Sequence, residues 1–130
     1  MSSFDRLSSD IVLIVDDVPE NLSLLHDALD EAGYTVLVAT SGESALQRAR
    51  QARPDVILLD ALMPGMDGFE VARLMRGTPH TRYTPIIFVS AIAHTRESVL
   101  RGYASGAVDF ILKPFDPQVL KHKINTLLAH

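Results

Sequence analysis

Five short apolar runs, rich in β-branched residues, recur along the chain and alternate with segments in which apolar residues repeat at helical spacing. Runs of this kind are typical of strands that are buried on both faces of a parallel sheet. The strands are predicted at residues 11–15, 34–39, 56–59, 85–89 and 107–112. Strands that alternate with helices in this way form βαβ units, which place helices on both faces of the sheet. The sequence therefore predicts an α/β fold.

The helical segments carry start and stop signals. Pro19 and Gly33 bound the first helix, and the capping residues at 40–43 begin a second helix that ends at Arg53-Pro54. Further helices are predicted at 67–76, 94–104 and 117–128. We expect the flavodoxin-like (βα)5 arrangement, with five parallel strands in the order 2-1-3-4-5. That order brings the acidic ends of the first and third strands together.

The composition sets the remaining bounds. The 130 residues suffice for one domain with its own core, which we place at 11–130 behind a flexible lead-in at 1–10. With no cysteine, the chain has no disulfide or cysteine metal site, which fits a cytoplasmic location. No secretory signal or membrane-spanning run occurs, so we expect a soluble protein with no membrane partner. The net charge of −4 argues against direct nucleic-acid binding, and the five scattered histidines show no metal-ligand spacing.

Four of the five predicted strands end in, or are followed by, a polar group: Asp16-Asp17, Asp60, Ser90 and Lys113. Because carboxyl ends of parallel strands share one edge of a sheet, these groups are expected to converge. Three carboxylates repel one another unless a cation is bound, and Mg²⁺ prefers carboxylate and phosphate oxygens. A hydroxyl and an ammonium group complement a phosphoryl group. The pattern predicts Mg²⁺-assisted phosphoryl transfer, with Asp60 as the nucleophile that forms an aspartyl phosphate.

Each of these residues, taken alone, also has a purely structural explanation. The two adjacent aspartates could cap a helix, and Asp60 could cap the turn after its strand. Ser90 could be an ordinary strand-end hydroxyl, and Lys113 could be a solvated charge before a proline turn. We prefer the functional interpretation because four strands end in groups that suit the same chemistry.

The same residues resemble the receiver domain of two-component response regulators, the CheY-like superfamily, from Ile11 to about Leu128. The match comprises the acidic pair, Asp60, Ser90, Lys113-Pro114 and the loop Met63–Gly68. The resemblance implies a site that binds Mg²⁺ or Mn²⁺. By the resemblance, the metal ligands would be Asp16, Asp17, Asp60 and the backbone carbonyl of Leu62; the phosphate-binding groups would be Lys113, Ser90 and the backbone of Ala91; and the switch residues would be Ser90 and Phe110.

The resemblance also implies a mechanism and partners. Asp60 would accept a phosphoryl group from the phosphohistidine of a histidine kinase or a phosphotransfer protein. The surface formed by residues 94–104, 107–112 and 117–128 would then change, and would act on a downstream output domain or protein or form a homodimer. Such a domain is not an enzyme beyond its own phosphorylation and dephosphorylation. The segments 18–22 and 115–124 resemble those of receivers joined to kinases or cyclic-dinucleotide enzymes.

Two departures from the family pattern bear on the lifetime and the switch. The positions two residues after Asp60 and two after Ser90 are Leu62 and Ile92, both apolar, whereas these side chains flank the route of the hydrolytic water in receivers. We therefore hypothesise slow self-dephosphorylation. Phe110 replaces a tyrosine and lacks the hydroxyl that could form a hydrogen bond at the switch.

Three other functions share some of these features. A haloacid-dehalogenase-like phosphatase also uses a strand-end aspartate and Mg²⁺, but it has a second aspartate where this chain has Leu62. A pseudo-receiver that only binds partners is disfavoured by the intact acidic pair, Asp60 and Lys113. A nucleotide-binding flavodoxin-like protein is weaker still, since no glycine fingerprint or Walker loop is present.

Overall fold

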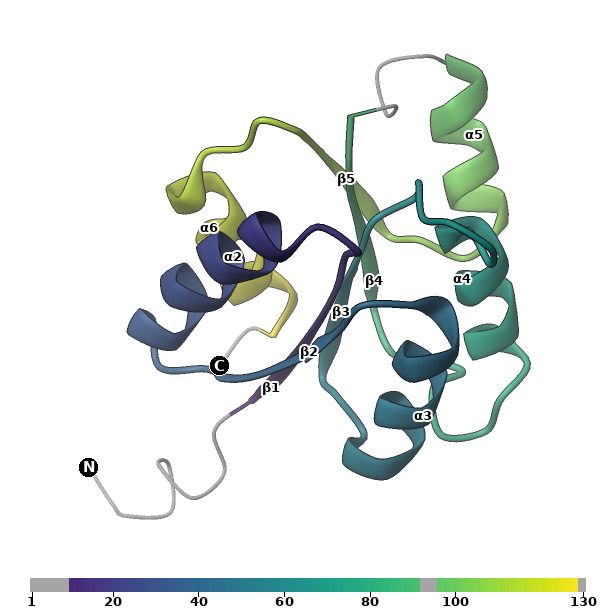
Figure 1. Cartoon of the computed structure of the whole chain (residues 1–130), viewed down its shortest axis with the longest axis horizontal. Helices are drawn as coiled ribbons and strands as arrows, with labels where there is room; N and C mark the ends of the chain where they lie inside the picture. The colour runs from purple at the N-terminus through teal and green to yellow at the C-terminus, as the bar shows by residue number, and fades with distance from the viewer. Residues whose placement is uncertain (1–9, 92–95, 129–130) are drawn as a thin grey trace.

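A computed structural model describes residues 10–91 and 96–128 of the chain (Figure 1). Within this range a single sheet contains five strands that pair in parallel in the order β2-β1-β3-β4-β5, which confirms the predicted topology. The strands are β1 Ile11–Val15, β2 Thr35–Ala39, β3 Val56–Leu59, β4 Ile86–Ser90 and β5 Asp109–Leu112. The predicted lead-in falls largely outside the described residues, as do Ile92, His94 and His130.

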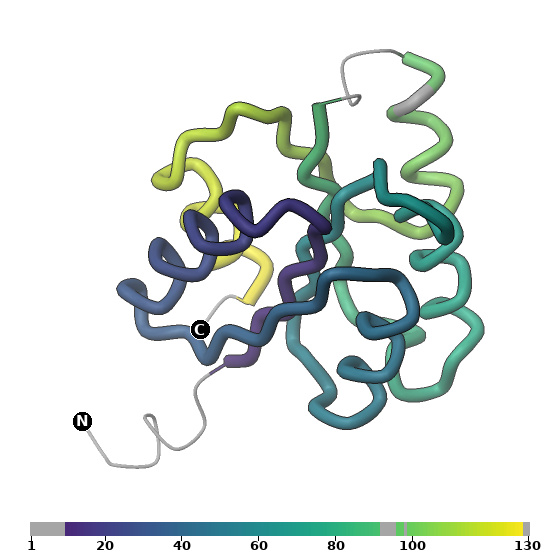
Figure 2. The backbone as a smooth tube through the Cα atoms, in the orientation of Figure 1, coloured from purple at the N-terminus to yellow at the C-terminus, as the bar shows by residue number. Residues whose placement is uncertain are grey.

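Among the described residues, five helices cover the two faces of the sheet. They are α2 Pro19–Glu31, α3 Gly42–Ala52, α4 Gly68–Arg76, α5 Arg96–Ala104 and α6 Pro117–Leu127. Figure 1 shows α2 and α6 on one face and α3, α4 and α5 on the other. The backbone trace in Figure 2 shows the same layers, with the first and last helices packed side by side. No helix in the described ranges is long and apolar enough to cross a membrane.

The core follows the two-residue alternation of the strands. Leu13 and Val15 of β1 point to the layer under α3 and α4, whereas Val12 and Ile14 point to the layer under α2 and α6. The β3 residues at 56–59 are likewise buried on both sides. This explains why the central strands are apolar without interruption, as expected for a parallel sheet between two helical layers.

Most element boundaries agree with the sequence predictions, and the differences have local causes. Tyr34 was predicted to begin β2, but its N–H donates to the carbonyl of Leu29 at 3.2 Å and so closes the turn after α2. The fifth strand was predicted from residue 107, yet its ladder with β4 starts at Asp109, opposite Ile87. The pairing partner decides this boundary, and a single run of apolar residues does not reveal it.

A row of aromatic rings lies on the face of the sheet that α4 and α5 cover. The ring centroids of Phe69 and Phe88 are 5.0 Å apart, those of Phe88 and Phe110 are 5.3 Å apart, and Tyr103 meets Phe110 edge-on at 5.6 Å. Gly102 of α5 makes room for this row, because a Cβ at that position would overlap the Phe110 ring. The Phe110 ring therefore lies inward, packed against the core.

Candidate functional site

The acidic site forms where β1 and β3 end side by side. These strands pair in register, with Val15 opposite Leu59, so the residues that follow, Asp16 and Asp60, emerge at the same edge of the sheet. A hydrogen bond from the Asp60 N–H to the Val15 carbonyl, at 3.0 Å, continues the ladder to this point. The topology thus produces the convergence predicted from the sequence.

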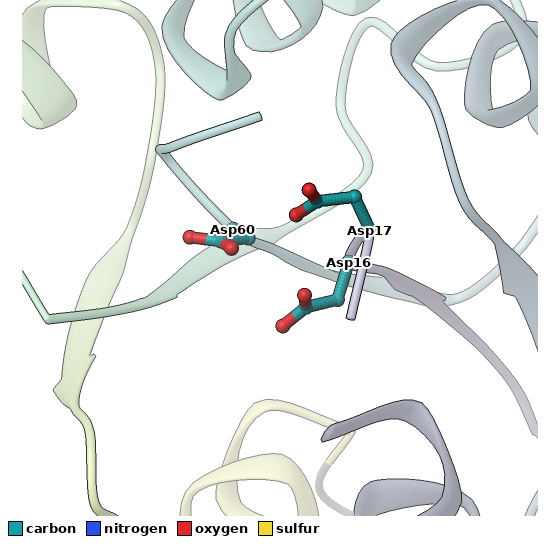
Figure 3. Close-up of side chains that lie close together, drawn as sticks. All are labelled: Asp16, Asp17 and Asp60. Carbon is teal, nitrogen blue, oxygen red and sulfur yellow. The ribbon is translucent and has the colours of Figure 1, made fainter. Parts of the chain in front are cut away.

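Three carboxylates meet at this edge (Figure 3). Asp16, Asp17 and Asp60 each offer an oxygen atom, and these atoms all lie within 4.8 Å of one another. Asp16 is 1% exposed and Asp60 is 6% exposed, whereas Asp17 reaches further into solvent. Such a set of carboxylate oxygens matches the ligands that Mg²⁺ prefers.

Lys113 is the cation that faces this cluster. Its Nζ atom lies 2.8 Å from Oδ2 of Asp16 and 3.3 Å from Oδ2 of Asp60, so a single ammonium group bridges the two buried carboxylates. Lys113 directly follows β5, and its N–H donates to the carbonyl of Ser90 at 3.2 Å. The peptide bond to Pro114 is cis.

Further donors fix the orientation of the two buried carboxylates. Oδ1 of Asp60 accepts the N–H of Leu62 at 3.1 Å, and Oδ1 of Asp16 accepts the N–H of Val18 at 2.9 Å. The side chain of Asn21 donates to Oδ2 of Asp16 at 3.2 Å. The contact of Asn21 is not predictable from the sequence, where its one signal is an asparagine, a weak helix former, in the first turn of a helix.

Burial and the neighbouring charges both shift the pKa values of Asp60 and Lys113. Burial raises the pKa of Asp60, with a contribution from the charge of Asp16, although the Leu62 N–H and Lys113 oppose the shift. Burial lowers the pKa of Lys113, but the hydrogen bond and charge of Asp16 and the charge of Asp60 outweigh it, so the net pKa is raised. Both groups therefore bind protons more tightly than usual. A divalent cation would offset the charge of the clustered carboxylates, so the donor set fits Mg²⁺.

The pKa of Asp60 leads to a prediction for metal-free protein. Because the folded pKa lies above the unfolded value of ~3.9, the free energy of unfolding falls as the pH rises through the interval between the two values. An asparagine at position 60 does not ionise, so the Asp60→Asn variant does not lose stability in this way as the pH rises. We expect it to be more stable than the wild type in EDTA at neutral pH, with the difference shrinking as the pH is lowered towards about 4. Urea unfolding of the wild type and of Asp60→Asn at each pH measures the two free energies of unfolding. A difference between them that does not change with pH would contradict this prediction.

The other predicted residues lie at or near the same edge of the sheet. Ser90 is the last residue of β4 and is fully buried. It pairs with Leu112, the residue that directly precedes Lys113. Ala91 follows it directly. Phe110 lies on β5, three residues before Lys113 and opposite Phe88, and its ring stacks on that of Phe88.

The loop after Asp60 is tightly closed. The N–H of Gly68 donates to the Ala61 carbonyl at 3.1 Å, and Leu62, which is 54% exposed, projects from the loop. Asp67 caps α4 by accepting the Glu70 N–H at 2.9 Å. The loop therefore holds the Leu62 backbone close to the carboxylates while it leaves the side chain in solvent.

Comparison with known proteins agrees with this geometry. The family model of the response regulator receiver domain matches residues 12–125. The response regulator PleD of Caulobacter vibrioides is 40% identical over 116 residues, which make up 89% of this chain and 25% of PleD, so the chain spans about a quarter of that relative. The structure of the chemotaxis protein CheY4 of Vibrio cholerae superposes with a TM-score of 0.88 at 34% identity, covering 92% of this chain and 99% of CheY4.

A third relative carries a metal. The receiver domain of the sensor histidine kinase PA1611 of Pseudomonas aeruginosa, solved with magnesium in its active-site cleft, has a TM-score of 0.86 at 28% identity and covers 95% of this chain and all of that domain. The family model spans most of the chain, and the sheet order and the acidic cluster are those expected of its members. This chain therefore belongs to the receiver domain family of two-component response regulators.

Proposed function

We propose that Asp60 is the phosphoryl acceptor of this receiver domain. The observation that carries the proposal is the position of its carboxylate, which is buried between two further aspartates and the ammonium group of Lys113. A nucleophile for phosphoryl transfer needs positioning and charge compensation, and this arrangement supplies both. The chain belongs to the receiver domain family, and its relatives include response regulators such as PleD, which supports a signalling role.

The donor would be the phosphohistidine of a histidine kinase or of a phosphotransfer protein. An oxygen of Asp60 attacks phosphorus, an O–P bond forms and the N–P bond breaks. The electron pair of that bond leaves with the imidazole, which takes a proton from water at neutral pH. Lys113 compensates the charge of the phosphoryl oxygens, and Ser90 and the backbone of Ala91 offer further hydrogen bonds to them.

Mg²⁺, or Mn²⁺ in its place, would be held by the carboxylates of Asp16, Asp17 and Asp60 and by the backbone carbonyl of Leu62. When bound, the ion neutralises charge on the transferring group. The burial of Asp16 and Asp60 supports this assignment, because these carboxylates and Asp17 lie together while the ammonium group of Lys113 supplies one positive charge.

The output would pass through Ser90 and Phe110 to the surface of α5, β5 and α6. Leu100, Tyr103 and Leu112 are large apolar side chains that this surface exposes. A downstream domain, a separate protein or a second copy of this chain would bind to these side chains and bury them. Phosphorylation would thereby be coupled to binding. We place this activity in the cytoplasm, where histidine kinases present their phosphohistidine.

The function is tested with acetyl phosphate as a small phosphoryl donor. Wild-type protein is expected to become phosphorylated when Mg²⁺ is present, and EDTA is expected to suppress the reaction at least about 100-fold, because the cation contributes several kcal/mol to charge stabilisation. Intact-protein mass spectrometry measures the phosphorylated fraction. Equal rates with Mg²⁺ and with EDTA would refute the metal-dependent mechanism.

Leu62 leads to a prediction about the lifetime of the phosphorylated state. An apolar side chain cannot orient the hydrolytic water, so we expect slow self-dephosphorylation, on a scale much longer than seconds. The Leu62→Asn variant supplies a hydrogen-bonding amide at an exposed position and should accelerate hydrolysis roughly 10-fold, less than the ~100-fold or more that a general base contributes, because an amide orients the water without taking its proton. The decay of the phosphorylated mass after removal of the donor measures the rate. A wild-type half-life of seconds, or an unchanged rate in the variant, would contradict this account.

A further inference from the structure

We propose that Asn21 is a positioning residue that holds the metal ligand Asp16 in place, and that it thereby sets the affinity of the site for Mg²⁺. The inference rests on the proposed function of the acidic cluster. It adds a residue from α2, an element that carries none of the metal or phosphate ligands named above. The observation is the hydrogen bond from Nδ2 of Asn21 to Oδ2 of Asp16, at 3.2 Å.

Asp16 is a buried carboxylate whose position depends on its donors. In the described part of the chain it accepts hydrogen bonds from the Val18 N–H at 2.9 Å, the Lys113 ammonium at 2.8 Å and the Asn21 amide. Lys113 divides its charge between Asp16 and Asp60. In phosphoryl transfer the ammonium group is needed at the phosphoryl oxygens on Asp60. The donors that remain on Asp16 are then the Val18 N–H and Asn21.

A neutral amide suits this task better than a second cation. Asn21 fixes one carboxylate oxygen without adding positive charge, so it orients Asp16 without repelling the metal. A lysine there would compete with Mg²⁺ for the same oxygen. Side chains that hold a metal ligand in this way typically change metal affinity or activity about 10- to 100-fold when they are removed.

The position of Asn21 in its helix supports a role outside helix stability. Asn21 is the third residue of α2, and its side chain points back to Asp16 instead of capping the helix. Asparagine is a weak helix former within a helix, whereas leucine is a strong one. Removing the amide should therefore leave α2 intact, and any effect on the metal site can be separated from an effect on folding.

The experiment compares Asn21→Leu, which has a side chain of similar size without a donor, with Asn21→Ala and with the control Ser23→Ala. Ser23 lies on the exposed face of the same helix. Isothermal titration of the unphosphorylated 130-residue chain with MgCl2 gives the Kd, and urea unfolding in EDTA gives the metal-free stability. We expect both Asn21 variants to bind Mg²⁺ about 10-fold more weakly, and Ser23→Ala to bind it as the wild type does.

The outcomes separate this inference from the proposed function. If the wild type binds Mg²⁺ and both Asn21 variants bind it within twofold of the wild type, the positioning role is wrong, and the acceptor assignment stands. A lower urea midpoint in EDTA combined with an unchanged Kd likewise assigns Asn21 a purely structural role and overturns the inference. If the wild type neither binds Mg²⁺ nor becomes phosphorylated, the proposed function fails and this inference fails with it.

Discussion

The Asp60→Asn variant is expected to incorporate no phosphoryl group from acetyl phosphate under conditions in which the wild-type protein becomes phosphorylated. Asparagine keeps the size of the side chain, but its amide oxygen is a poor nucleophile, and the proposed Mg²⁺ site would lose one of its carboxylates. The amide also leaves Lys113 with one carboxylate instead of two. Intact-protein mass spectrometry with Mg²⁺ present measures the result.

The matched control for this variant is Asp27→Asn, the same chemical change on α2 at a carboxylate whose side chain is 80% exposed. It is expected to be phosphorylated as the wild type is, because this carboxylate is exposed and pairs with His26 on α2. Full incorporation in Asp60→Asn would show that another residue is the acceptor. Loss of incorporation in both variants would show that the assay reports general protein damage.

Replacing Gly68 with alanine should lower the free energy of unfolding more than any other substitution discussed above. A Cβ at this position would overlap the carbonyl oxygen of Asp60 and lie 2.8 Å from Cα of Ala61, and these are backbone atoms that cannot rotate away. The loop must therefore open, which should lower the free energy of unfolding by about 3 kcal/mol. The same movement displaces Asp60 and the Leu62 carbonyl, so phosphoryl incorporation should also fall. Urea unfolding in EDTA and the mass assay measure the two effects.

Gly77→Ala provides the control for that substitution. Gly77 ends α4 with an ordinary φ of −85°, and a Cβ there would meet its nearest neighbour, the Leu74 carbonyl oxygen, at 3.6 Å. Alanine should leave the stability within about 0.5 kcal/mol of the wild type or raise it slightly. Equal stability of the two variants would contradict the close packing of Gly68 against the Asp60 backbone.

The fold was predictable because its signals are local and repeated. The predicted bounds of β1 and β3 coincide with the observed ones, since a wholly apolar run between turn residues has few alternatives. The strand order followed from the requirement that the acidic strand ends meet, and the structure confirms it. The start of β5 was wrong by two residues because it depends on where β4 offers partners.

The site was predictable only as far as strand ends determine it. Asp16, Asp17 and Asp60 follow paired strands, so the sheet brings them together whatever the helices do. The contact of Asn21 depends instead on the rotation of α2 about its axis, which the positions of its apolar residues define only approximately. The contacts of Arg101 likewise depend on how α5 is rotated. Its Cζ atom lies 4.4 Å from the centre of the Phe69 ring, and its guanidinium nitrogen lies 3.5 Å from Oδ2 of Asp67. Contacts between helices and loops of this kind require the packed structure.

Chemical mapping of the phosphorylated residue shows directly whether Asp60 is the phosphoryl acceptor. Reduction of the phosphorylated protein with borohydride converts an aspartyl phosphate to homoserine, which peptide sequencing by mass spectrometry then locates. We expect homoserine at position 60 and unmodified aspartate at positions 16 and 17. Homoserine at another position, or a phosphoryl group that borohydride does not remove, would contradict it.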